Sequence, residues 1–147
     1  MMEVTNESLD SWLAVLKPYQ RKSIKSLLEC NGGDEEKVAQ LWLNSYGPIN
    51  TATFGGVPSS SINKNYFQCL KDELNGLICG SEKYEEERKS ILQKGELINI
   101  ATSTKIAYLL APIVGLSEVV LTPAVVLLLH VIGKVSVNAY CSMINRT

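Results

Sequence analysis

Residues 106–144 read IAYLLAPIVGLSEVVLTPAVVLLLHVIGKVSVNAYCSMI, and this apolar stretch decides how the rest of the chain folds. Only Glu118 and Lys134 carry a full charge within it, and it holds the single histidine of the protein, His130. The residues before it are more polar and hold most of the acidic and basic side chains. Because the burial of apolar surface drives folding, the stretch must lie in a core, in a partner interface or in a membrane.

Two helices joined by a short break are predicted in this stretch. Thr122 is a good N-cap and proline suits the first helical position, so a helix is predicted from Pro123 to about Ile144. Further upstream, Pro112 and the sequence Gly-Leu-Ser at residues 115–117 predict that an earlier helix ends near residue 115. The sequence therefore predicts a helical hairpin and not one long span.

The predicted apolar hairpin, residues 96–147, can be a buried core or a membrane-inserted segment. A transmembrane helix needs about 20 predominantly apolar residues. The uncharged run 106–117 is shorter than that, and the run Val119–Gly133 is divided by Pro123. Runs of this length are more typical of core helices, so a core is favoured, with membrane insertion of residues 97–144 as the alternative.

The second helix of the hairpin carries the candidate interaction residues. They are His130, Lys134 and Asn138, spaced four apart along one ridge, and Val126, Val137 and Tyr140 on another side. The polar ridge either faces solvent, or it lines a pore or meets an acidic partner. Gly133 would allow another backbone to approach this helix closely.

The charge of the chain argues against two kinds of partner. Its 147 residues have a net charge of −1, so bulk electrostatics favour neither nucleic acid nor anionic lipid. The chain starts with the acidic and polar sequence MMEVTNESLD, which is not typical of a signal peptide. We expect a cytoplasmic protein, with membrane association as the alternative.

The four cysteines, Cys30, Cys69, Cys79 and Cys141, are scattered along the chain. None forms a Cys-x-x-Cys pair, and with a single histidine no zinc-site pattern exists. Scattered cysteines of this kind are typical of buried, reduced thiols in the cytoplasm. We therefore expect all four thiols to be reduced.

A small helical bundle is predicted for residues 1–46. An apolar stripe at residues 9–16 predicts its first helix, which ends before Pro18 because the residue before a proline avoids the helical conformation. A second helix is predicted over Pro18–Cys30, and the sequence Asn-Gly-Gly at residues 31–33 ends it. Asp34 is expected to cap a third helix.

Part of this bundle resembles a known family. Residues 27–43, LLECNGGDEEKVAQLWL, resemble the second and third helices of ubiquitin-associated (UBA-like) domains, and the likeness extends over residues 9–45. At residues 17–19 the chain has Lys-Pro-Tyr where the family usually has a Met-Gly-Phe/Tyr loop that contacts ubiquitin. The resemblance implies a small three-helix bundle that binds a peptide or a helix.

The middle of the chain is predicted to be a linker followed by charged helices. Residues 47–61, GPINTATFGGVPSSS, are rich in loop-forming residues and mark a boundary. Residues 62–79 form an amphipathic helix and residues 82–94 a strongly charged one, so that 62–95 is a third segment. The charged helix either is a solvated face or docks a partner electrostatically.

The sequence offers no recognisable reactive site. His130 has no acidic residue within one turn, and no Gly-x-Ser-x-Gly sequence is present. We predict no catalytic, cofactor-binding or metal-ligating residues and no small-molecule substrate. The expected protein is a non-enzymatic, all-α interaction subunit of a complex or oligomer, whose apolar C-terminal helices form its core or a partner seam. The alternative is a small membrane-inserting effector of the toxin or defence type that uses residues 97–144.

Overall fold

The computed structural model describes residues 4–46, 66–91 and 98–145, and the predicted linker at 47–61 lies outside them. Within these ranges the regular secondary structure is helical, apart from one isolated β-bridge, and the predicted all-α fold is confirmed. The helices are α1 (Leu9–Leu13), α2 (Pro18–Cys30), α3 (Glu35–Tyr46), α4 (Tyr66–Cys79), α5 (Glu85–Ile91), α6 (Ile100–Val114), α7 (Glu118–Val135) and α8 (Val137–Asn145), with a short 3-10 turn, η2 (Glu82–Tyr84).

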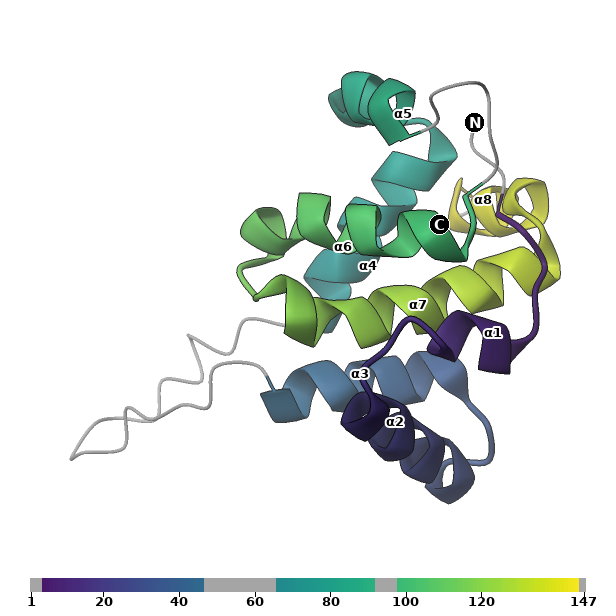
Figure 1. Cartoon of the computed structure of the whole chain (residues 1–147). Helices are drawn as coiled ribbons and strands as arrows, with labels where there is room; N and C mark the ends of the chain where they lie inside the picture. Colours follow the sequence, from purple (N-terminus) through teal and green to yellow (C-terminus); the bar gives the residue numbers. More distant parts are fainter. Residues whose placement is uncertain (1–3, 47–65, 92–97, 146–147) are drawn as a thin grey trace, which may run out of the picture.

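Helix α7 lies at the centre of the fold, with α3 on one side and α6 and α4 on the other (Figure 1). Every side chain from Leu121 to His130 is buried. A helix that is apolar on all sides needs cover all round, and here helices from both halves of the chain supply it. The buried apolar residues of the predicted N-terminal, middle and C-terminal segments form one core.

Helix α7 begins at Glu118 and not at Pro123, which corrects the predicted start. The side chain of Ser117 caps its first turn and so fixes the earlier beginning. Pro123 therefore lies inside the helix, where its missing N–H leaves the carbonyl oxygen of Val119 without its usual partner. Gln20 replaces that partner, because its Nε2 donates a hydrogen bond to this oxygen at 2.8 Å.

A second side chain from the N-terminal half reaches the same turn of α7. The indole Nε1 of Trp42, on α3, donates to the next carbonyl oxygen, that of Val120, at 2.7 Å. Both Gln20 and Trp42 are buried. Side chains from α2 and α3 thus both bind the turn of α7 that precedes Pro123, and these bonds hold the N-terminal helices against α7.

The predicted continuous helix to about Ile144 is also corrected. Helix α7 ends at Val135, and Ser136 has a φ of 89°, a left-handed value that is uncommon for a residue with a side chain. Helix α8 then starts at Val137 and packs against α4 and α7. By contrast, α6 ends as predicted at Gly115, which caps it in the left-handed conformation.

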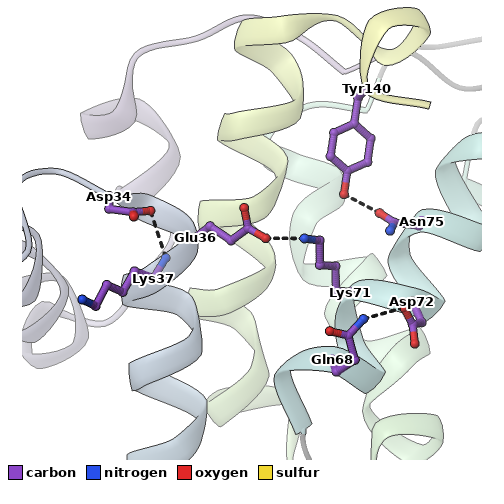
Figure 2. A network of polar contacts seen from close by, with 8 residues as sticks. All are labelled: Asp34, Glu36, Lys37, Gln68, Lys71, Asp72, Asn75 and Tyr140. Atoms are coloured by element: carbon purple, nitrogen blue, oxygen red, sulfur yellow. Dashed lines mark hydrogen bonds and ion pairs between the residues drawn. The ribbon is translucent and has the colours of Figure 1, made fainter. Parts of the chain in front are cut away.

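Polar contacts join the helices that surround α7 (Figure 2). Lys71 on α4 forms an ion pair with Glu36 on α3. The hydroxyl of Tyr140 on α8 donates to Asn75 on α4. Burial, with a smaller contribution from the negative charge of Glu36, raises the pKa of Tyr140 to about 12, although the hydrogen bond to Asn75 acts to lower it. The tyrosine therefore stays neutral through the physiological range and keeps its proton for this bond.

A disulfide joins Cys79, at the end of α4, to Cys141 in α8. The prediction of four reduced and buried thiols is therefore wrong for this pair. It is also wrong for the burial of Cys30, which is exposed, while Cys69 is partly buried. The spacing of the cysteines carries no sign of the bond, because Cys79 and Cys141 meet only when α8 folds back onto α4.

The predicted close approach at Gly133 is confirmed. The N-terminal segment crosses α7 here and pairs with residue 98, since the backbone N–H of Thr5 donates to the carbonyl oxygen of Ile98 at 2.9 Å. A Cβ atom added at Gly133 would lie 2.5 Å from the carbonyl oxygen of Thr5. A side chain at this position would displace the backbone of the N-terminal segment.

Substitution Gly133→Ala is expected to destabilise the protein by up to about 2 kcal/mol, since overpacking costs about 1–3 kcal/mol and the helix propensity of alanine offsets about 1 kcal/mol. Gly76→Ala, inside α4, is the matched control. Its added Cβ would make only ordinary contacts of 3.5 Å or more, so this variant should be neutral or more stable. Urea denaturation of both variants measures the difference, and equal effects would contradict the close approach.

One helix in the described part of the chain is long and apolar enough to cross a membrane. It is α7, Glu118–Val135, with a mean hydropathy of 1.9. In the fold, 67% of these residues are buried by other helices. The core helix of a soluble protein has the same properties, so length and composition alone do not assign this helix to a membrane.

Candidate functional site

A groove of about 590 Å³ lies between α5, α6 and the first turn of α7. Its apolar surface comes from Ile91 on α5 and from Tyr108, Leu109 and Pro112 on α6. Tyr108 is 72% exposed. The groove therefore presents an aromatic ring and aliphatic groups to solvent, in the volume range of sites that bind small molecules or anchoring side chains.

Charged side chains flank this apolar surface. Glu87 comes from α5, Lys105 from α6 and Glu118 from the first turn of α7. Among the residues that the structure describes, none of the three side chains takes part in an ion pair or hydrogen bond. The lining of the groove thus includes two carboxylates and one ammonium group.

Arginine contacts at the end of α4 hold α5 in place as one wall of the groove. The guanidinium of Arg88 donates to the carbonyl oxygen of Leu77 at 3.1 Å and to that of Ser81 at 2.7 Å. These oxygens belong to the last turn of α4 and the bend after it, where helical carbonyl groups lack partners within the helix. The Arg88 side chain satisfies them and sets the direction of α5.

A second polar cluster anchors η2, just before α5. Lys83 donates to Glu73 Oε1 at 2.8 Å, and the hydroxyl of Tyr84 donates to the same oxygen. The hydrogen bond from Lys83, followed by that from Tyr84, lowers the pKa of Glu73. Burial is the main cause that raises the pKa of Tyr84, and its bond to Glu73 adds to it. The ionised carboxylate and the neutral phenol thus support each other.

The predicted polar ridge meets an acidic side chain inside the protein. His130 hydrogen-bonds through Nδ1 to Glu35, and Lys134 Nζ donates to the other oxygen of that carboxylate at 2.8 Å. Both His130 and Glu35 are buried, so the solvent-facing interpretation of the ridge is wrong for His130. The partner is the first residue of α3, and its carboxylate also suits the positive end of that helix.

The other candidate interaction residues lie apart from this ion-pair cluster. Val126 and Val137 are buried within the core, and Tyr140 is partly buried against α4. Asn138 is exposed on α8, and the break at Ser136 separates it from the ridge. None of the six predicted residues lines the groove. Their role in binding a partner stays a prediction.

Sequence reasoning missed the groove, although a signal for it was present. Thr104, Tyr108 and Pro112 are spaced four apart and form one ridge of α6. The uncharged run 106–117, which contains Tyr108 and Pro112, is predicted to be a core helix, and the inner face of α6 is indeed buried. The exposed tyrosine on the outer face could have been noticed, but the wall made by α5 depends on tertiary packing.

Helices α2 and α3 form at the predicted positions, whereas α1 ends at Leu13, earlier than predicted; α3 packs along α7. The third helix of the UBA-like resemblance is thus in contact with the rest of the chain, and the resemblance itself stays a prediction. Within the described ranges, no group of three or more His, Cys, Asp or Glu side chains could hold a metal ion. In comparisons with known proteins, no family model, curated protein or solved structure matches this chain.

Proposed function

We propose that this protein is a non-enzymatic helical interaction subunit, with α7 as its core and the outer face of α6 as the surface that meets a partner protein. The observation that supports this proposal is the apolar outer face of α6. Tyr108, Pro112 and Ile113 are exposed there, while the opposite face of the same helix is buried in the core.

An exposed apolar helix face next to a groove is typical of an interaction site. Scattered apolar residues are normal on a protein surface, but adjacent ones that surround a groove favour association. Aromatic residues are enriched in such interfaces because one ring buries much area at low entropic cost. Tyr108 has the position and the exposure of such an anchor.

Photo-crosslinking in the native cells tests the proposal. A photo-reactive amino acid at Ile113, on the α6 face but outside the groove, should yield discrete crosslinked products. The same group at Lys22, exposed on α2, is the control and should yield fewer. A full-length chain that stays monomeric by light scattering and gives no product specific to residue 113 would contradict the proposal.

A second candidate is the membrane-inserting effector, and the observation that favours it is the length and hydropathy of α7. Insertion would require α7 to leave α3 and to break the cluster of His130 and Lys134 with Glu35. Alkaline carbonate extraction of cell membranes distinguishes the two candidates. An interaction subunit is released into the supernatant, whereas an inserted hairpin stays in the pellet.

A further inference from the structure

We infer that the groove between α5 and α6 receives a segment of a partner protein in which a bulky apolar side chain lies beside one lysine or arginine. This inference rests on the proposed function and names the chemistry of the partner. The apolar side chain would pack against Tyr108 and Leu109, and the cation would approach the carboxylates of Glu87 and Glu118.

The groove is partly open to solvent and has room for an anchoring side chain. Its volume of about 590 Å³ lies within the range of about 300–1,000 Å³ that is usual for ligand sites. The apolar groups lie on two helices, with Ile91 on α5 and Leu109 on α6, so a side chain between them would lose water on both sides. Such desolvated pockets are where interface energy concentrates.

The charges indicate that the partner brings a cation. Glu87 and Glu118 are both partly covered by the protein, and neither has an ionic partner among the described residues. Complementary charge raises the association rate and excludes acidic competitors. The same two carboxylates disfavour an anionic lipid surface, which attracts basic segments.

The position of Lys105 limits the number of basic residues that the partner segment can bring to the groove. It precedes Pro112 by seven residues on α6, which corresponds to about 10 Å along a helix. Glu118 follows the turn after Pro112, so Lys105 and Glu118 lie toward different ends of the groove. A partner with one basic residue near the Glu118 end fits this pattern, whereas a polybasic run would meet the ammonium group.

Peptide selection against the full-length protein tests the inference. The probe is a random dodecapeptide library displayed on phage, with the Tyr108→Ala variant used for counter-selection. Peptides that survive should combine an aromatic or large aliphatic residue with a nearby lysine or arginine. Failure to enrich any peptide over the Tyr108→Ala variant would overturn the inference, and so would enrichment of peptides without a basic residue.

The affinities of the selected peptides for variants of the protein measure how much each groove residue contributes to binding. Tyr108→Ala is expected to weaken binding at least about tenfold, which corresponds to about 1.4 kcal/mol. The charge-neutral double variant Glu87→Gln/Glu118→Gln should weaken it several-fold and reduce its dependence on salt. Tyr19→Ala, on the exposed surface of α2, is the control and should change nothing. Equal affinity for all variants would place the peptide elsewhere and refute the inference.

Failure of the inference can be told apart from failure of the proposed function. Crosslinks from residue 113 should decrease strongly in the Tyr108→Ala background and several-fold in the Glu87→Gln/Glu118→Gln background if the groove holds the partner. Crosslinks that persist undiminished in both backgrounds would overturn the groove inference and leave the interaction subunit in place. Absence of crosslinks from residue 113 in the protein without these substitutions would contradict both the groove inference and the proposed function.

Discussion

Replacing Glu35 by alanine is expected to lower the free energy of unfolding by about 1–3 kcal/mol, the usual cost of leaving a buried polar group without its hydrogen-bond partner. The Glu35 carboxylate is the acceptor for both His130 and Lys134, and its side chain is only 7% exposed. Without it, the buried imidazole of His130 loses its acceptor. Lys134 is half exposed and can turn to solvent, so the loss comes mainly from the histidine.

The neighbouring residue provides a matched control. Glu36 also lies in the first turn of α3, so both glutamates interact similarly with the helix dipole. Its ion pair with Lys71 is much more exposed, and Glu36→Ala should therefore cost at most about 1 kcal/mol. Chemical denaturation followed by circular dichroism measures both variants. Equal losses in the free energy of unfolding would show that burial of the Glu35 contacts adds nothing to stability.

A double variant separates the ion pair from the packing at the same place. Glu35→Leu/His130→Leu replaces both buried polar partners with apolar groups, and such replacements are often neutral or stabilising. The double variant should therefore recover most of the stability that Glu35→Ala loses. Persistent instability would mean that the polar contact itself positions α3 on α7.

Much of the helical structure could be predicted from the sequence, because caps and breakers act locally. Asp34 accepts a hydrogen bond from the backbone of Lys37 and caps α3 as expected. Pro18 begins α2, and Gly115 ends α6. Two local caps compete for the start of α7, Thr122 and Ser117. Ser117 is the one used, and Gln20 supplies the hydrogen bond that Pro123 inside the helix cannot.

Contacts between distant residues explain what the sequence could not predict. Glu35 and His130 are 95 residues apart, and no local pattern relates them. The partner that accommodates Pro123 is Gln20, from a different helix and far away along the chain. The groove has the same origin, since one wall depends on how Arg88 fastens α5 to the end of α4.

Loss of the disulfide between Cys79 and Cys141 is expected to destabilise the protein by about 4 kcal/mol. The two cysteines are 62 residues apart, and a cross-link that closes a loop of this length restricts the unfolded chain by about that free energy. A domain of this size is usually stable by only about 5–15 kcal/mol. The Cys79→Ala/Cys141→Ala variant should therefore unfold at a much lower urea concentration.

The effect of the disulfide on stability is measured most cleanly in a variant that has no other thiols. Cys30→Ser/Cys69→Ser removes the two free cysteines, so that no exchange can occur with the bond. In this background, a reductant should lower the free energy of unfolding by the same amount as Cys79→Ala/Cys141→Ala. Adding the reductant to that variant should have no further effect.

Thiol counting under denaturing, non-reducing conditions decides whether the bond forms in the cell. Two reactive thiols, from Cys30 and Cys69, are expected if the bond is present, whereas four would contradict it. Structural disulfides persist mainly in oxidising compartments, so a count of two in protein taken from its native cells would argue against the predicted cytoplasmic location. With four thiols, α8 would lose its covalent link to α4, while its packing against α4 and α7 and the hydrogen bond from Tyr140 to Asn75 would remain.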